Sequence, residues 1–335
     1  MLNERRRRVL QALVEEYIAS ATPVGSKTLV NRYELGCSPA TVRNELSILE
    51  ETGFLMQPHV SAGRLPTDTG YRSFVDDLIE RDGASADSEE GSANVVPKAS
   101  EVDELMRETS LALTRLTDCL AVVLSPSVSL ARVRQIDLLS MAPRRALMVL
   151  ITESGQVVNR SIELAEETVP QRLHDVEAAL NVAFDAKRAA DIRTLRVALE
   201  AAHQDDTLVR RVVDEILDAL AEADRDRLYH VGVPALLAQP EFHDAARARP
   251  LIEFLEDGIS VLEALSDALG NRELIVRIGH ENRRAELGNV SIVAINYGVG
   301  SADGVVGVIG PTRMDYSRAM AAVRVVASGL SEALT

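Results

Sequence analysis

Arg43 and Asn44 stand side by side in a stretch whose side chains suit hydrogen bonding to DNA bases. A guanidinium group bonds a guanine edge or a phosphate, and an asparagine amide pairs with adenine through two hydrogen bonds. The small residues Ala40 and Ser47 would let this stretch approach a groove closely. Such residues also occur on an ordinary solvated helix face, so the neighbouring elements must decide between the two interpretations.

The stretch itself is predicted to be a helix over residues 39–52. Ser38 is a favourable N-cap, because its hydroxyl can accept a hydrogen bond from an otherwise unpaired amide at the helix start. Pro39 suits the first helical position, because proline has no amide hydrogen to leave unpaired there. Gly53 suits the position just beyond the helix end. The predicted buried stripe is spaced four and three residues apart and consists of Val42, Leu46 and Leu49.

The flanking segments favour a DNA-binding unit. A short helix at residues 26–33 precedes a turn at Gly36, and residues 54–57 and 65–67 are predicted strands joined by a loop with Arg64 at its basic tip. Helix, turn, helix and hairpin together are typical of a winged helix-turn-helix, in which Arg64 would reach a minor groove or a phosphate. The predicted DNA-contacting residues are Lys27, Ser38, Ala40, Thr41, Arg43, Asn44, Ser47, His59, Ser61 and Arg64.

Length and composition exclude several other classes. A chain of 335 residues indicates two or three domains. Its apolar runs are far shorter than the roughly 20 residues of a membrane span, and its first 20 residues lack the pattern of a signal peptide, so we expect a cytoplasmic protein without a membrane partner. Two cysteines, Cys37 and Cys119, indicate neither a disulfide framework nor a metal cluster.

The sequence predicts no catalysis, no metal and no cofactor. The glycine-rich segment 296–310 lacks the following helix of a dinucleotide-binding loop. The six histidines show no metal-ligand spacing. His280, Glu281 and Asn282 could form an acid-base cluster, although a polar turn after a strand is the commoner origin of such a group.

Charge is distributed unevenly along the chain. Residues 1–75 contain nine basic and eight acidic residues, whereas the whole chain has a net charge of −15. The remainder therefore carries −16, which should suppress nonspecific binding to DNA. The basic run at residues 5–8 could contact a DNA backbone, but a helix N-terminus disfavours cations, so we interpret the run as a solvated face.

The rest of the chain is predicted to be α+β. Residues 82–100 are rich in small and acidic residues, as in a flexible linker. Alternating or short apolar runs predict strands between residues 122 and 163 and again between residues 273 and 309, with helices before, between and after them. The stretch between the two sets is mostly helical.

Two segments resemble one protein family. Residues 38–76, SPATVRNELSILEETGFLMQPHVSAGRLPTDTGYRSFVD, and residues 278–298 with 307–320, IGHENRRAELGNVSIVAINYG and GVIGPTRMDYSRAM, are similar to the HrcA family of heat-inducible transcription repressors, although Val60 stands where the family usually has threonine. The resemblance implies a winged-helix head, a GAF-like domain and an inserted dimerisation domain. The predicted units are residues 1–80 for the head, 81–100 for the linker, 101–185 with 271–335 for the GAF-like domain, and 186–270 for the insert.

The predicted insert carries an unusually apolar segment. An insert of this size is marginal as a self-contained core, so burial against a second copy is one interpretation, and packing back on the GAF-like sheet is the other. The predicted dimerisation residues are Leu251, Phe254, Leu255, Ile259 and Leu262.

The resemblance implies a homodimer that represses chaperone operons at an inverted-repeat DNA operator. It also implies that heat inactivates the repressor and that a GroEL-type chaperonin maintains it. Two alternatives stay open: a winged-helix regulator controlled by a small effector bound in the GAF-like domain, and an enzyme with a DNA-binding head. The low aromatic content, 3%, favours the chaperonin-maintained repressor over a regulator with an effector site.

Overall fold

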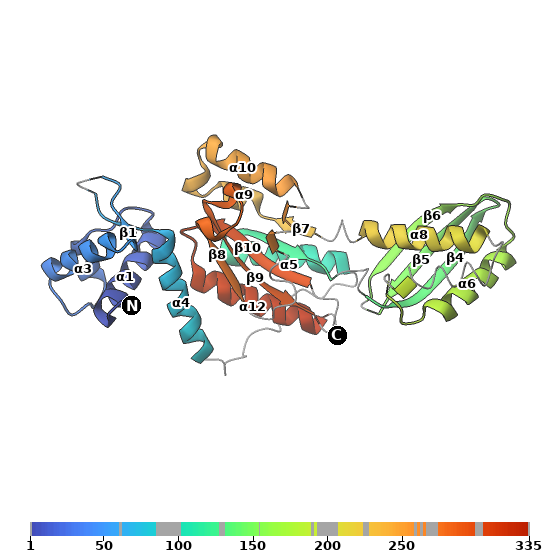
Figure 1. The fold of residues 1–335 in the computed structure, drawn as a ribbon, viewed down its shortest axis with the longest axis horizontal. Helices are drawn as coiled ribbons and strands as arrows, with labels where there is room; N and C mark the ends of the chain where they lie inside the picture. Colours follow the sequence, from blue (N-terminus) through green and yellow to red (C-terminus); the bar gives the residue numbers. More distant parts are fainter. Residues whose placement is uncertain are drawn as a thin grey trace.

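The structure is a computed structural model that describes residues 2–59, 62–84, 102–126, 131–153, 155–188, 191–192, 207–223, 228–257, 260–261, 264–265, 274–298 and 304–333. Helices and strands are mixed, which confirms the α+β prediction. We distinguish a head (described residues 2–84), a body built on a five-stranded sheet, and a distal lobe built on a three-stranded sheet (Figure 1).

The head consists of helices and one small antiparallel sheet. Its elements are α1 (Glu4–Ser20), α2 (Ser26–Arg32), α3 (Pro39–Glu51), β1 (Leu55–Met56), β2 (Leu65–Pro66) and α4 (Asp68–Ala84). Helix α3 begins where the sequence predicts, because the Ser38 hydroxyl accepts a hydrogen bond from the Thr41 amide at 3.2 Å. Gly53, with φ of 82°, follows its end. Val42, Leu46 and Leu49 are at most 1% exposed, as expected for the buried stripe.

The body is a five-stranded antiparallel sheet in the order β7-β3-β10-β9-β8. Its strands are β3 (Leu120–Leu124), β7 (Leu228–Val231), β8 (Ile275–Ile278), β9 (Val290–Tyr297) and β10 (Gly304–Pro311). Helices α5 (Val102–Thr117) and α12 (Tyr316–Ala333) cover one face, and α9 (Val233–Leu237) with α10 (Ala245–Glu256) packs on the other. Coverage of both faces explains why every residue of β3 and β10 is buried.

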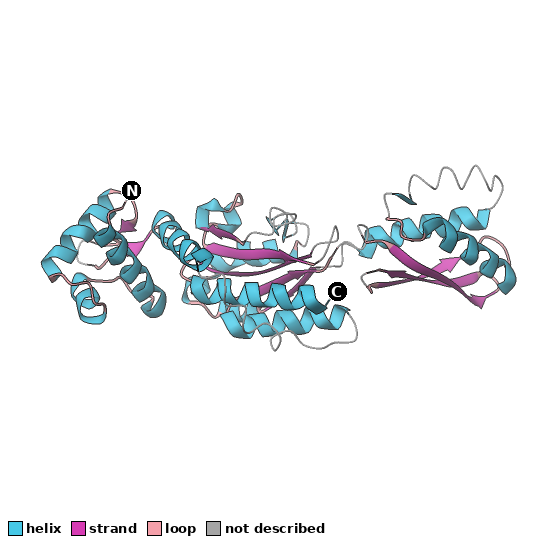
Figure 2. Cartoon of the chain, turned by 90° about the horizontal axis from the view of Figure 1, so that it is seen from below, coloured by secondary structure: helices cyan, strands magenta, loops and turns pink. Residues whose placement is uncertain are grey.

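The distal lobe has its own buried core. Strands β4 (Val133–Ala142), β5 (Arg145–Thr152) and β6 (Val157–Glu163) form an antiparallel sheet, and α6 (Pro170–Phe184) and α8 (Thr207–Ala223) pack on one of its faces. The burial of alternate residues along β5 shows that the sheet has one covered and one open face. Figure 2 shows this lobe at the end of the molecule opposite the head.

This division differs from the predicted domain boundaries. Strands β4 to β6 and helix α6 were expected in one domain with the C-terminal strands, but they pack with α8 in a separate cluster. Conversely, β7 and α10 were expected in the insert, yet β7 pairs with β3 and α10 packs on the five-stranded sheet. The reason is strand pairing between residues distant in sequence, such as Ala121 with Val231. The predicted linker falls mostly outside the described residues, and α4 continues through residues 81–84 of it.

The apolar segment of α10 is not a free surface. Leu251, Phe254 and Leu255 are 1%, 4% and 5% exposed because they pack against β3, β9 and β10. The expectation that these residues form a dimer surface is therefore wrong, and the alternative of packing on the sheet holds. Ile259 and Leu262 lie outside the described residues.

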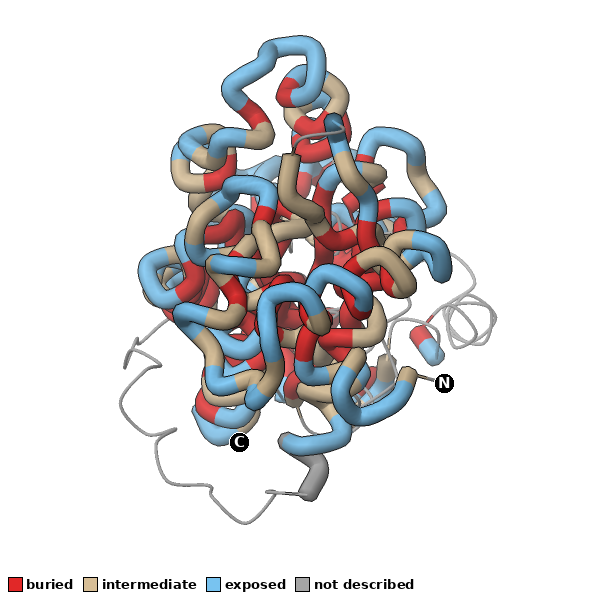
Figure 3. The backbone as a smooth tube through the Cα atoms, turned by 90° about the vertical axis from the view of Figure 1, so that its left-hand side faces the viewer, coloured by how far each residue is buried: buried red, intermediate tan, exposed pale blue. Residues whose placement is uncertain are grey.

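Seen with the head toward the viewer, exposed residues follow the outer turns and buried residues lie inside (Figure 3). Among the helices that the structure describes, none has the length and apolarity to cross a membrane.

Candidate nucleic-acid interface

Helix α3 presents Arg43 and Asn44 to solvent. Both residues are exposed, and their side chains make no hydrogen bond or ion pair within the described part of the chain. The opposite face of α3 is held in the head core by Val42 and Leu46. This anchoring fixes the helix, so the two side chains project from a rigid element and keep their hydrogen-bonding groups available.

The other predicted residues of α2 and α3 have mixed roles. Lys27 and Ala40 are also exposed. Ser38 and Thr41 bond each other at the helix start, with 3.0 Å between their hydroxyl oxygens. The Ser47 hydroxyl donates to the carbonyl oxygen of Arg43 at 3.2 Å. Thus the three hydroxyl groups are already bonded within α3 and its N-cap, and Lys27, Arg43 and Asn44 remain the groups free for a ligand in this part of the structure.

Arg64 does not lie at a loop tip. Its Nε and Nη2 atoms are 3.1 and 3.0 Å from Oε2 of Glu50, and its backbone pairs with Val24 in both directions at 2.9 and 2.8 Å. The side chain is only 18% exposed. The predicted position at the tip is wrong because these contacts hold Arg64 at the base of the hairpin. His59 is exposed in the loop, and Ser61 lies outside the described residues.

The basic run at the start of α1 serves the head internally. Arg6 forms an ion pair with the buried Glu45 at 2.8 Å, and Arg7 pairs with Asp77 at 3.5 Å. Arg8 donates to the carbonyl oxygen of Glu34 at 2.7 Å. Sequence reasoning missed these partners, which come from other segments of the head and leave no local signal.

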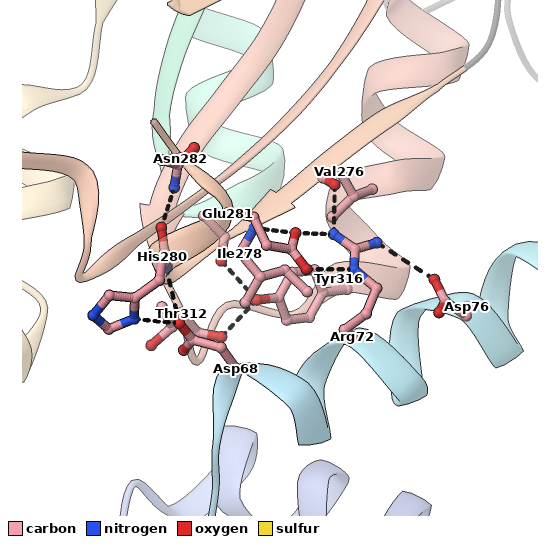
Figure 4. Close-up of polar contacts among 12 residues, drawn as sticks. Asp68, Arg72, Asp76, Val276, Ile278, His280, Glu281, Asn282, Thr312 and Tyr316 are labelled. Atoms are coloured by element: carbon pink, nitrogen blue, oxygen red, sulfur yellow. Dashed lines mark hydrogen bonds and ion pairs between the residues drawn. The ribbon is translucent and has the colours of Figure 1, made fainter. Parts of the chain in front are cut away.

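The His280-Glu281-Asn282 group is structural. It belongs to a short 3₁₀ helix, Gly279–Glu281, that follows β8. The Asn282 amide donates to three backbone carbonyl oxygens at 2.9 to 3.2 Å, and His280 and Glu281 contact α4 of the head (Figure 4). These contacts account for the polar side chains of the three residues without a catalytic role.

The remaining chemistry-bearing groups lie apart from α3. The described residues contain no group of histidines, cysteines and carboxylates placed to hold a metal ion. Burial raises the pKa of the Cys119 thiol to about 12, which makes it an inert packing residue. An open cavity of about 1090 Å³ lies in the distal lobe and is lined by charged groups of both signs, including Arg144, Glu163 and Arg211.

The relatives of the chain are transcription repressors, a class that binds DNA. Residues 103–320 match the family model of the HrcA protein C-terminal domain. The chain is 42% identical to the heat-inducible transcription repressor HrcA of Nocardioides sp., with 100% of this chain and 99% of that protein covered. It is 40% identical, with the same coverage, to the heat-inducible transcription repressor HrcA of Streptomyces avermitilis.

The chain therefore belongs to the HrcA family of heat-inducible transcription repressors, as the sequence resemblance predicted. The crystal structure of a hypothetical protein at 2.2 Å resolution shares the fold: it is 24% identical, covers 100% of this chain and 99% of its own, and has a TM-score of 0.70.

Proposed function

We propose that this protein represses heat-shock operons by binding their operator with a winged helix-turn-helix head, in which α3 is the reading helix. The observation that carries the proposal is the pair Arg43 and Asn44, exposed and without polar partners in the described structure, on a helix whose other face is buried. The β1-β2 hairpin after α3 would be the wing. Family membership supports the repressor role.

The test is operator binding by Arg43→Ala and Asn44→Ala on the DNA upstream of the protein's own gene. Each substitution should cost about 1 to 3 kcal/mol on the cognate site and relax base preference, because each removes base-edge contacts. The control is Arg145→Ala, which removes an exposed arginine from the distal lobe. If the α3 variants keep their fold and bind like the wild type, α3 is not the reading helix.

We also propose that the repressor binds an inverted repeat as a homodimer, since one head reads only a short half-site. The open face of the distal sheet is the surface that supports dimerisation. Leu139, Met141 and Val157 are 51%, 65% and 59% exposed there, and the register places Leu139 beside Leu147, and Val157 beside Ile151. Leu147, Val149 and Ile151 form an apolar strip along β5 on this face, with Leu139 and Val157 beside it and Asp137, Asn159 and Ser161 at its edges. An exposed apolar strip with a polar border favours association.

Leu139→Asp should dissociate the dimer in sedimentation experiments and weaken binding to the inverted repeat, because it places a charge in the buried interface. Val182→Asp is the matched control, since Val182 is 85% exposed but lies on helix α6 outside this face. A Leu139→Asp protein that remains dimeric would exclude this surface.

We infer that heat stress lowers the population of the active repressor and that a GroEL-type chaperonin restores it. Stability is typically only about 5 to 15 kcal/mol and falls on heating, so a form with loosened packing would lose its operator and expose apolar surface to a chaperonin. Operator binding should recover after mild heating only when chaperonin and ATP are present. Full recovery on cooling alone, with no gain from chaperonin, would favour a direct thermosensor or the effector-controlled alternative.

A further inference from the structure

The head is attached to the body through side chains of α4 as well as through the chain itself. The contact joins α4 to the end of β8, to the 3₁₀ helix Gly279–Glu281 and to the start of α12 (Figure 4). Residues of the head and of the body also share one buried apolar cluster. The two units are therefore packed together, whereas the sequence indicated a head held only by a linker.

Arg72 of α4 is the centre of the polar contact. Its Nε atom lies 2.7 Å from Oε1 of Glu281, and its Nη2 atom also contacts the second carboxylate oxygen. The same Nη2 atom donates to the carbonyl oxygen of Val276 at 2.6 Å. A planar guanidinium held at three acceptors of the body fixes direction as well as distance.

Asp68, one turn before Arg72, makes the second contact. Its Oδ2 atom accepts hydrogen bonds from the backbone amide of His280 at 2.9 Å and from the ring Nδ1 of His280 at 2.7 Å. Gly279 makes this approach possible. It has φ of 50°, and a Cβ atom there would overlap the Asp68 carboxylate.

The body reaches the head at two further points. Arg313, 14% exposed, donates to the carbonyl oxygen of Ile18 near the end of α1 at 3.1 Å while forming an ion pair with Glu241 at 2.6 Å. The rings of Tyr71 and Tyr316 are buried against each other, with centroids 5.9 Å apart. We call the contacts of Asp68, Arg72, Tyr71, Gly279, His280, Glu281, Arg313 and Tyr316 the head lock.

The head lock leaves the reading face open. Helix α3 lies on the side of the head away from the five-stranded sheet (Figure 1), and Arg43 and Asn44 stay exposed. A docked head is thus not blocked by the body. Two heads fixed in direction would already have the relative orientation that an inverted repeat requires. This preorganisation lowers the entropic cost of binding both half-sites.

We propose that the head lock positions the reading helix and that the docked arrangement is the operator-binding form. The inference rests on the proposed dimeric repressor. The head-lock residues position α3 and do not touch DNA. Because the body part of the lock lies where β8 ends, where β10 ends and where α12 begins, loosening of this end of the sheet releases the head.

The test compares two DNA duplexes, a single half-site and the full inverted repeat, at one salt concentration. The variants are Gly279→Ala, which places a methyl group against Asp68, and Glu281→Gln, which removes the charge opposite Arg72. Gly288→Ala is the matched control, since Gly288 has helical backbone angles and its added Cβ would lie 3.3 Å from the carbonyl oxygen of Ala285.

Both lock variants should bind the half-site like the wild type but lose about 10- to 100-fold on the inverted repeat, a part of the avidity that linked sites can provide. They should also tolerate an altered spacing between half-sites better than the wild type. Hydrogen exchange of the His280 amide, which donates to Asp68, should become faster in both.

Equal binding of the inverted repeat by wild type and variants overturns the positioning role. Tighter binding of the inverted repeat by the variants also overturns the positioning role, since the lock would then inhibit DNA binding. If the wild type binds neither duplex, the proposed function fails and this inference fails with it. Half-site binding by the wild type therefore separates failure of the lock from failure of the repressor assignment.

Discussion

Replacing Arg64 tests whether this arginine stabilises the hairpin or contacts DNA. In the structure its guanidinium is bonded to Glu50 of α3, and its backbone pairs with Val24. Arg64→Ala should therefore weaken operator binding indirectly, by loosening the hairpin from α3. Glu50→Gln removes the charge of the partner and should have the same kind of effect, although Glu50 is not a DNA-contacting candidate.

The expected magnitude follows from burial. Exposed ion pairs contribute about 0 to 1 kcal/mol, and breaking a buried pair costs about 3 to 5 kcal/mol. The side chains of Arg64 and Glu50 are 18% and 33% exposed, so Arg64→Ala should lower the free energy of unfolding by about 1 to 2 kcal/mol. A double-mutant cycle should give a coupling energy of about 1 kcal/mol, because the residues are in direct contact.

The assay is the salt dependence of operator binding, measured beside denaturant unfolding. A phosphate contact contributes about 0.9 to the slope of log K against log salt concentration. If Arg64 only supports the hairpin, Arg64→Ala and Glu50→Gln lower affinity without changing this slope. A slope reduced by about 0.9 per head in Arg64→Ala alone, with full affinity in Glu50→Gln, would refute the structural interpretation.

Three further predictions concern the core of the head, the two thiols and a polar contact in the distal lobe. Leu46→Ala, at a position 1% exposed in α3, should cost about 2 to 5 kcal/mol in denaturant unfolding, whereas Ser47→Ala should stay within about 0.5 kcal/mol; equal costs would contradict the assigned helix face. Burial raises the pKa of Cys119 to about 12, so an alkylating reagent at pH 8 should label Cys37 first, as read by peptide mass spectrometry, and equal labelling rates would place Cys119 at the surface. Asn181→Ala should destabilise the distal lobe by about 1 to 3 kcal/mol, since the amide bonds both the N–H and the C=O of one residue of edge strand β4 at 2.8 and 2.7 Å; unfolding unchanged in circular dichroism would refute this role.

Helix α3 shows what local sequence can predict. Its start is determined by the Ser38 hydroxyl, its first residue is Pro39, and Gly53 follows it with a left-handed backbone, as expected. The observed end, Glu51, differs from the prediction by one residue. Each of these features depends on groups within four residues, so the sequence contains the information. The exposed Arg43 and Asn44 follow directly from the 3.6-residue period.

Strand partners are different, because pairing joins residues far apart. The predicted strands exist, but nothing local assigns β3 and β7 to one sheet and β4 to β6 to another. The pattern of apolar residues along each strand does contain a signal that separates the two sheets. Strand β3 is apolar throughout, as in a sheet covered on both faces, whereas β5 alternates, as in a sheet with an open face.

The apolar residues of α10 show a second limit of local sequence. Their periodicity predicts that these side chains are buried, but either a second copy of the chain or the chain's own sheet could cover them. Only the tertiary contacts of Leu251 and Phe254 identify the sheet as the partner. The ion pair of Arg64 with Glu50 is hidden from sequence for the same reason, since 14 residues separate its members.

Charge pairing within the head explains why placement of the head matters for binding. Most of its arginines are neutralised by carboxylates of the head or of the body: Arg6 by Glu45, Arg7 by Asp77, Arg32 by Glu16, Arg64 by Glu50 and Arg72 by Glu281. Lys27 and Arg43 are exposed without such a partner among the described residues. With the rest of the chain strongly acidic, general attraction to phosphate is small. In the proposed dimer, affinity would then come from a few contacts made on both half-sites at once. Such binding requires two heads held in fixed directions, which is the geometric condition that the proposed docking of α4 would supply.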